Sequence, residues 1–194
     1  MISKKQLHRG FTLVETLLAV LILTMAIAGP LTIASKGLQL TLIARDQVMA
    51  GLLAQDALEY VHFVRDTNKL NNQNWLAGFN SVSNNHTTNL TGGQADCTGG
   101  NHCTIDSLAD QVTYCGTSLA QCASSYLYFN SSGGNYTYQT SGNTRTIFSR
   151  TISITTPSPG GNASEADVVV VVQWKDIGGV TRSLELRNAL LDWQ

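Results

Sequence analysis

The chain has 194 residues, of which 43% are hydrophobic and 13% are charged, and its formal net charge is -1 at pH 7. That length is enough for one modest domain besides a long helix. Its 12 Lys and Arg are scattered among 13 Asp and Glu, whereas a general nucleic-acid binder usually carries a clustered basic patch. The composition therefore argues against that class of protein.

An apolar run over residues 11–35 is the first element of the chain, and the next charge after it is Lys36. As a helix this run would be about 37 Å long, enough to cross a hydrocarbon core of about 30 Å. Three basic residues and no acid precede it: Lys4, Lys5 and Arg9. The positive-inside tendency then places the N-terminus in the cytoplasm and everything after Lys36 outside. A conventional secretory signal fits less well, because its apolar region is shorter and ends at a small-residue cleavage site.

Glu15 is the one charged residue within the apolar run. A carboxylate in hydrocarbon costs about 2.5 to 3.5 kcal/mol on insertion scales, so it normally has a partner or a function. One interpretation is that Glu15 stays hydrated near the interface or is protonated. The other is that a cut between Gly10 and Phe11 frees an amino group on Phe11, which pairs with Glu15 of a neighbouring copy. Such a pair would neutralise both charges and set the axial register of packed helices.

The basic head, the glycine, the phenylalanine, the acid and the long apolar run together resemble the type IV pilin and type II secretion pseudopilin superfamily. In this resemblance residues 1–10 are a leader peptide, and Gly10 precedes the cut made by prepilin peptidase. Phe11 is the new N-terminus that becomes N-methylated, and Glu15 is the acid used in assembly. The resemblance implies a structural subunit that is not an enzyme and has no cofactor.

The resemblance also implies where the protein works and with what. The subunit would first lie in the inner membrane as a single-pass protein with a cytoplasmic N-terminus, and would then enter an extracytoplasmic or cell-surface filament. The implied partners are prepilin peptidase, other pilin or pseudopilin subunits and the inner-membrane assembly platform. Nucleic acid is an expected partner only through a role in DNA uptake.

The helical pattern continues beyond the apolar run. Gly29 and Pro30 fall inside the run, and proline removes one backbone hydrogen bond, so we expect a kink or local melting there. Apolar residues then recur at helical spacing, at Leu42, Met49, Leu53, Ala57, Tyr60 and Val64. We predict a helix to about Thr67, with a transmembrane and assembly half over 11–35 and an amphipathic half over 36–67.

Residues 68–194 are expected to form a β-rich extracytoplasmic head. Clusters of Asn, Gly, Thr and Ser predict loops over residues 68–111. From residue 125 the period changes to two, which predicts strands at 126–129, 136–138, 146–155, 168–174 and 180–190, the last two joined by a hairpin at 176–179. The expected fold is therefore α+β and pilin-like: a long N-terminal helix packed against a small antiparallel sheet with a loop-rich insert.

Four cysteines lie in the expected loop region 97–122: Cys97, Cys103, Cys115 and Cys122. Outside the membrane an even set favours two disulfides, for which three connectivities exist. Local pairing would close two small loops, whereas crossed pairing would pin the strands of a hairpin, and we favour local pairing. A zinc knuckle with His102 is the alternative, but five and six intervening residues depart from the usual two to four, so no metal is expected.

The finer role is less constrained. The chain has no cysteine after Cys122, whereas many major pilins of Gram-negative bacteria carry a disulfide close to the C-terminus, so the resemblance is closest to a minor pilin or minor pseudopilin. No nucleophile motif or His-Glu-x-x-His pair is present, which argues against an enzyme. Two alternatives stay open: a binding, adhesion or DNA-uptake module at a filament tip, and a single-pass membrane protein that never polymerises.

Overall fold

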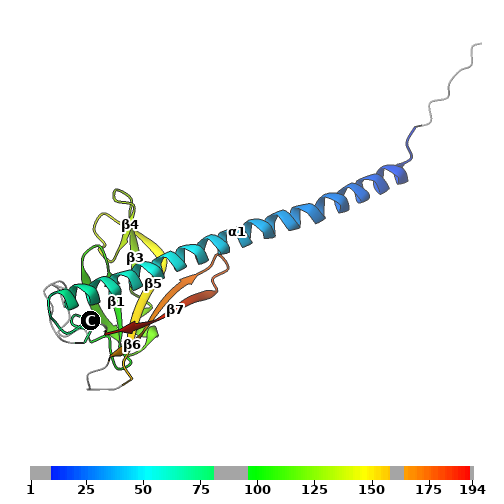
Figure 1. The fold of residues 1–194 in the computed structure, drawn as a ribbon. Helices are drawn as coiled ribbons and strands as arrows, with labels where there is room; N and C mark the ends of the chain where they lie inside the picture. Colours follow the sequence, from blue (N-terminus) through cyan, green and yellow to red (C-terminus); the bar gives the residue numbers. More distant parts are fainter. Residues whose placement is uncertain (1–9, 81–95, 158–163, 193–194) are drawn as a thin grey trace, which may run out of the picture. The chain divides into compact units, whose positions relative to one another are not determined.

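The computed structural model of the chain describes residues 10–80, 96–157 and 164–192. The chain divides into two compact units, Met1–Ala44 and Arg45–Gln194. Helix α1 is followed by strands β1 to β7, with the short helix α2 between β2 and β3 (Figure 1). The elements are α1 Leu13–Leu70, β1 His102–Asp106, β2 Gln111–Gly116, α2 Leu119–Cys122, β3 Tyr126–Asn130, β4 Asn135–Thr137, β5 Thr144–Thr155, β6 Glu165–Lys175 and β7 Thr181–Leu191.

The first unit contains the N-terminal half of α1. The helix passes through Gly29 and Pro30 without interruption, so the local melting expected there is wrong, while a kink stays a prediction. Proline deprives only the Ala26 carbonyl of its hydrogen bond. The turn that follows gains one in return, because Thr32 Oγ1 donates to the Ala28 carbonyl at 2.9 Å. Helix on both sides of the proline is long enough to propagate across it.

The second unit contains an antiparallel sheet, which has seven strands among the described residues. β5 is its centre. One edge of β5 pairs with β1 at Cys103↔Ile152 and with β3 at Tyr126↔Ser149. The other edge pairs with β6, and β6 with β7. The α+β prediction is confirmed, as are the strands expected within β3 to β7.

The turn between β6 and β7 follows from its sequence. The backbone N–H of Asp176 donates to the carbonyl of Val180 at 3.0 Å. The Asp176 carboxylate accepts from the backbone N–H groups of Gly178 and Val180, both at 2.9 Å. Gly179 has φ of 77°, a left-handed conformation that favours glycine. Arg182 Nε donates to Asp176 Oδ2 at 2.8 Å and, together with the backbone donors, holds the pKa of Asp176 below its usual value.

The loop predicted over residues 68–111 is partly wrong. β1 lies inside that range, and β2 and α2 lie inside the expected loop region 97–122. β1 is short and polar, and its hydrogen bonds come from β2 and β5 rather than from a local pattern. Tertiary pairing therefore decides its conformation. Residues 81–95 of the predicted insert lie outside the described residues.

The amphipathic half of α1 buries one stripe against the sheet (Figure 1). The residues of this stripe are Ala50, Leu53, Ala54, Ala57, Leu58, Tyr60, Val61, Val64, Arg65 and Asn68. Four of the six predicted positions are among them, Met49 is partly buried, and Leu42 is exposed. Across the stripe, β5 and β6 contribute Ile152, Ile154, Val168 and Val170 to the same core. The sheet and this half of the helix therefore share one hydrophobic core.

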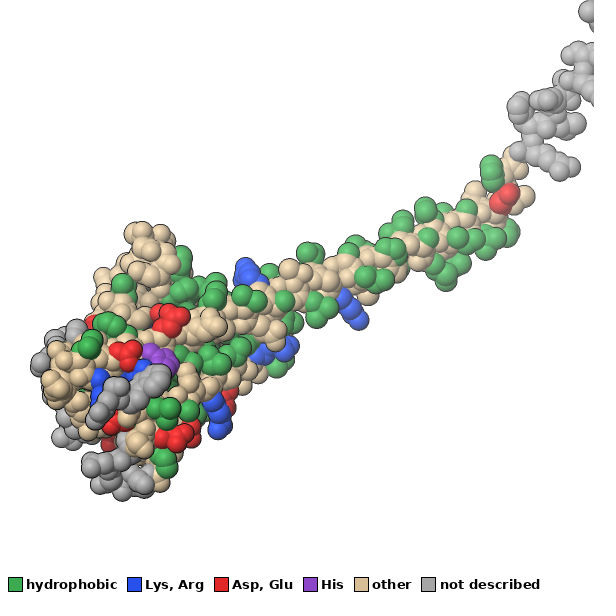
Figure 2. Space-filling view, in the orientation of Figure 1, with side chains coloured by type: hydrophobic (Ala, Val, Ile, Leu, Met, Phe, Trp, Pro, Cys, Tyr) green, Lys and Arg blue, Asp and Glu red, His purple; other side chains and the backbone are tan. Residues whose placement is uncertain are grey.

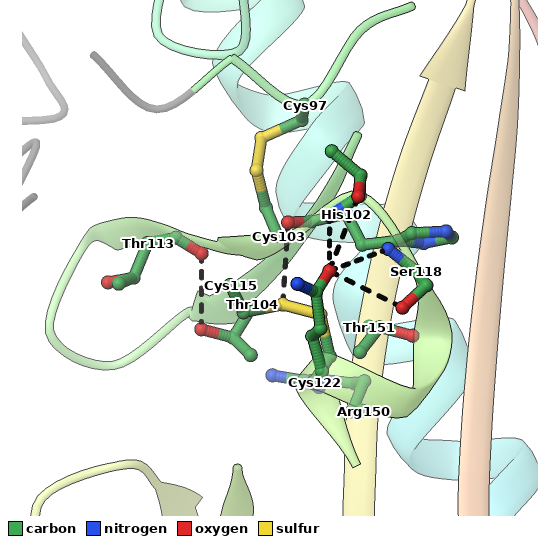
Figure 3. Close-up of a disulfide and its surroundings, with 12 residues drawn as sticks. Cys97, His102, Cys103, Thr104, Thr113, Cys115, Ser118, Cys122, Arg150 and Thr151 are labelled. Carbon is green, nitrogen blue, oxygen red and sulfur yellow. Dashed lines mark hydrogen bonds between the residues drawn. A yellow bond between two sulfur atoms is a disulfide. The ribbon is translucent and has the colours of Figure 1, made fainter. Parts of the chain in front are cut away.

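Two disulfides join neighbouring segments of the head, Cys97–Cys103 and Cys115–Cys122 (Figure 3). These are the local pairs. Cys97 and Cys103 are fully buried, and the backbone of Cys97 bonds the carbonyl of Phe79 at 2.7 Å and the amide of Ile154 at 2.8 Å. The second disulfide ties β2 to α2. All four thiols are therefore consumed and none is left as a ligand for a zinc knuckle.

We predict that the Cys97→Ala/Cys103→Ala variant loses more stability than the Cys115→Ala/Cys122→Ala variant. Both disulfides close loops of similar length, so each contributes about 2 kcal/mol through the unfolded chain. Both cysteines of the first disulfide are fully buried, whereas Cys115 of the second is only partly buried. Removal of the first therefore disturbs more packing and also the backbone bonds of Cys97. Urea unfolding of the full chain in detergent measures both. Equal losses in the two variants would contradict the assigned role of the buried disulfide.

Candidate functional site

The start of α1 places the residues of the expected cleavage and assembly site. Thr12 caps the helix: its carbonyl accepts from the amides of Glu15 at 3.1 Å and Thr16 at 3.2 Å, and its hydroxyl accepts from Glu15 N at 3.3 Å. Gly10 and Phe11 precede the helix and are exposed. The bond between them is therefore accessible in extended chain. Residues 1–9, which hold the rest of the expected leader, lie outside the described residues.

The N-terminal half of α1 is apolar and uncovered by the chain. Leu17 is 62% exposed, Leu21 51% and Ile33 74%, and hydrophobic side chains surround the visible surface of this segment (Figure 2). Among the described residues, α1 is the one helix long and apolar enough to cross a membrane, and none of its most apolar stretch is buried. An exposed apolar surface of this extent marks a membrane or protein contact.

The hydroxyl groups of this segment are satisfied within the helix. Thr16 donates to the carbonyl of Leu13 at 2.8 Å, Thr24 to Leu21 at 2.9 Å, Thr32 to Ala28 at 2.9 Å and Ser35 to Thr32 at 2.9 Å. Such bonds let polar side chains enter hydrocarbon at low cost. The carboxylate of Glu15, in contrast, has no partner in the described part of the chain. Among the described residues 11–35, it is the one charged group.

A comparison with known families agrees with this arrangement. The prokaryotic N-terminal methylation motif matches residues 5–29, which include Gly10, Phe11, Glu15 and the apolar run as far as Gly29. This match indicates a type IV pilin-like protein. The motif belongs to a structural family and not to an enzyme family. No curated protein and no solved structure matches the chain.

The head of this pilin-like protein contains a second polar site, which holds the amphipathic half of α1 on the sheet. Arg150 of β5 is fully buried. Its Nη1 donates to the carbonyl of Leu53 at 2.8 Å and to the carboxylate of Asp56, and its Nη2 donates to the carbonyl of Ile105 at 2.6 Å. Ser107 Oγ also donates to Asp56, at 3.0 Å. One guanidinium therefore joins α1, β1 and β5.

Asp106 organises the turn between β1 and β2. Its Oδ1 accepts from the amides of Leu108 and Ala109, and its Oδ2 accepts from Thr137 Oγ1 at 2.6 Å and Tyr138 N at 2.8 Å. The carboxylate thereby joins this turn to the end of β4. Tyr138 Oη in turn donates to the carbonyl of Arg150 at 2.7 Å. The turn, β4 and β5 are thus connected through polar groups that have defined partners.

Two tyrosines of this network are held in the neutral form. Burial raises the pKa of Tyr138 to about 12, against the opposing effect of Arg150. Burial also raises the pKa of Tyr60 on α1, whose hydroxyl donates to Asp110 Oδ1 at 2.7 Å. An ionised phenolate at Tyr60 would face this carboxylate. Both groups therefore stabilise the fold only while they are protonated.

Sequence reasoning identified the N-terminal site and missed the network in the head. A signal was present, because Arg150 occupies the inward phase of the alternating strand that also carries Phe148, Ile152 and Ile154. A charge at such a position is buried and has to be paired. Its partners were not predictable, since the carbonyls of Leu53 and Ile105 come from segments far away in the chain.

We predict that Arg150→Met destabilises the head by about 3 to 5 kcal/mol, because it leaves buried carbonyls without a donor. Asp56→Asn should cost about 1 kcal/mol or less, because the Asp56 side chain is 45% exposed and solvent screens the pair. Arg187→Met, at an exposed arginine of β7, is the matched control and should change stability by less than about 0.5 kcal/mol. Urea unfolding measures the stability of the three variants. Similar losses of stability for Arg150→Met and Asp56→Asn would contradict the central role of the guanidinium.

Alkaline pH should destabilise the head through its buried tyrosines. A raised folded pKa means that the stabilisation is complete below the unfolded value of about 10 and is lost as pH rises through about 12 for Tyr138. Tyr138→Phe should reduce the loss of stability with rising pH to the part that is due to Tyr60. At neutral pH this variant should be about 1 kcal/mol less stable, because one hydrogen bond is lost. Tyr114→Phe, at an exposed ring, is the control. Thermal unfolding between about pH 8 and 12 measures the slopes, and identical slopes for wild type and Tyr138→Phe would reject the assignment.

Proposed function

We propose that this pilin-like chain is a minor pilin or minor pseudopilin, a structural subunit of a type IV pilus or type II secretion-like filament. The observation that carries the proposal is the unpartnered carboxylate of Glu15 within an otherwise self-satisfied, uncovered apolar helix. The subunit is held in the inner membrane by this helix. It then packs helix to helix with other subunits in a cell-surface filament.

The methylation motif implies processing by a prepilin peptidase and assembly with other pilin subunits. A cut between Gly10 and Phe11 leaves a new amine one residue before the Thr12 cap. A cation at the N-terminus of a helix is opposed by the helix dipole, whereas a carboxylate in the first turn is favoured. A second carboxylate near the amine offsets the unfavourable charge. Glu15 of a neighbouring copy supplies it and at the same time finds its own missing partner.

The same surface serves both stages of this proposal. In the bilayer, lipid covers the exposed side chains of the apolar half. In the filament, copies of the helix replace the lipid, and burial from water contributes about 25 cal/mol per Å² of apolar surface. The charge pair adds little to the adhesion itself. It sets the axial register, because apolar packing alone allows one helix to slide along another.

The alternative of a binding or adhesion module at a filament tip is favoured by a separate feature, an open cavity in the head lined by Arg145 and Lys175. This alternative is compatible with a minor subunit. The third possibility, a single-pass membrane protein that never polymerises, differs in needing no partner for Glu15.

We predict that Glu15→Ala inserts into the membrane and is processed normally but fails to enter filaments or enters them out of register. The physical reason is that the Phe11 amine of each neighbour loses its counter-charge. Glu59→Ala, at an exposed acid of the same helix, is the matched control and should assemble as wild type. Immunoblots of sheared filaments and of membranes measure the two pools.

Mass spectrometry of both pools checks processing in the same experiment. The mature chain is expected to begin at Phe11 with one added methyl group. Wild-type filament incorporation of Glu15→Ala would overturn the pairing of Glu15 with the Phe11 amine, and absence of the wild-type chain from filaments would support the simple membrane anchor. An uncut precursor as the working species would overturn the proposal independently of the variant.

A further inference from the structure

An open cavity of about 410 Å³ lies on the face of the sheet that α1 leaves uncovered. α1 covers the face of β5 that carries Phe148 and Arg150. Side chains alternate along a strand, so Ser149 projects to the opposite face, as does its cross-strand partner Gln173 on β6. The cavity is lined chiefly by Tyr126, Arg145, Ile147, Ser149, Gln173 and Lys175. Strands β3, β5 and β6 therefore contribute most of the lining, and β7 adds Thr181.

The cavity carries positive charge without a compensating acid. Among the residues that the structure describes, Arg145 and Lys175 are the charged residues that line it, and no Asp or Glu does. Within the described chain neither cation has an ion-pair partner. The arginines of β7 differ from these two cations, because Arg182 is paired with Asp176 and Arg187 with Glu185. Two unpaired cations beside one hollow create a site for an anionic group.

The guanidinium of Arg145 is held in place before any ligand arrives. Its central carbon lies 3.8 Å from the centre of the Tyr126 ring. Stacking on an aromatic face restricts the side chain and leaves the planar edge of the guanidinium free to donate. That edge matches two oxygens of a carboxylate or a phosphate. Restriction of this kind lowers the entropy lost on binding.

The cavity also offers uncharged polar groups to a ligand. Ser149 is only 4% exposed, and its hydroxyl has no hydrogen-bond partner among the residues described. Ser149 lines the cavity beside the amide of Gln173, and Ile147, 43% exposed, adds apolar surface. A ligand that carries hydroxyl groups as well as an acid would satisfy both kinds of group.

We propose that this cavity binds an anionic sugar, that is, a single sugar ring that bears a carboxylate or a phosphate. Arg145 and Lys175 bind the acid, Ser149 and Gln173 hydrogen-bond ring hydroxyls, and Ile147 contacts the apolar edge of the ring. The volume lies in the range of small-molecule sites. A nucleic-acid strand would need a charged groove that follows its backbone, and two cations at one hollow do not form one. This activity goes beyond the proposed structural role and does not require filament assembly.

The test uses the processed full chain in a zwitterionic detergent, because sugar-based detergents would compete for the site. Glucuronate, glucose 6-phosphate and glucose are titrated to about 10 mM, above the dissociation constants expected of weak sites, and binding is followed by saturation-transfer NMR. Binding of either anionic sugar at least about tenfold tighter than glucose supports the proposal. The stronger of the two tells whether the acid is a carboxylate or a phosphate.

Variants assign the binding to the cavity. Arg145→Gln should weaken it by about tenfold or more and Lys175→Gln by a smaller factor, since the arginine alone has a fixed bidentate edge. Arg187→Gln, on the same face but outside the cavity, should bind as wild type. Ser149→Ala should weaken the anionic sugar but leave inorganic phosphate unchanged.

Four results would overturn the proposal. These are no binding of either anionic sugar, equal binding of glucose, equal weakening by Arg187→Gln, and binding of a short single-stranded oligodeoxynucleotide instead of the sugars. Inorganic phosphate as tight as glucose 6-phosphate would remove the sugar from the assignment and so also count against it. These results are independent of the Glu15→Ala experiment. A failure of sugar binding therefore does not contradict the assembly role, and a failure of the assembly role does not contradict sugar binding in the cavity.

Discussion

The structure depends on one constraint, which is that the described part of the chain leaves the apolar half of α1 exposed. Leu17 and Ile33 are exposed, and the hydroxyls of Thr16 and Thr24 donate to backbone carbonyls of the same helix. Nothing in this segment competes with burial in lipid or against other helices. A single carboxylate interrupts it at the first turn. A membrane or another protein is therefore the expected cover for this surface.

The head binds the amphipathic half of the same helix. A small domain with long loops has a limited core. Here the core is reinforced by two disulfides and by the guanidinium of Arg150, which reaches carbonyls on α1 and β1. Buried charge is costly unless fully paired. Here it links the helix to β5, the centre of the sheet.

Covering one face of the sheet with α1 leaves the other face for recognition. β5 carries both functions by alternation, since Arg150 faces the helix and Ser149 faces the cavity. The strand that anchors the helix thus also forms the wall of the open site. In the proposed role as a filament subunit, the chain would have one surface for assembly and another that assembly of the helices does not cover.

The sequence by itself determined the elements that depend on local pattern and charge. Glu15 alone in an apolar run, the basic residues before Gly10, the period-two strands and the turn at Asp176 are all local features, and the fold class follows from them. Tertiary structure decided what depends on distant partners. β1 exists because β2 and β5 pair with it, and Arg150 is neutralised by groups remote in the chain. The cavity forms where four strands, β3, β5, β6 and β7, come together. Long-range contacts of this kind leave no periodic trace in a sequence, because each partner satisfies its own local rule.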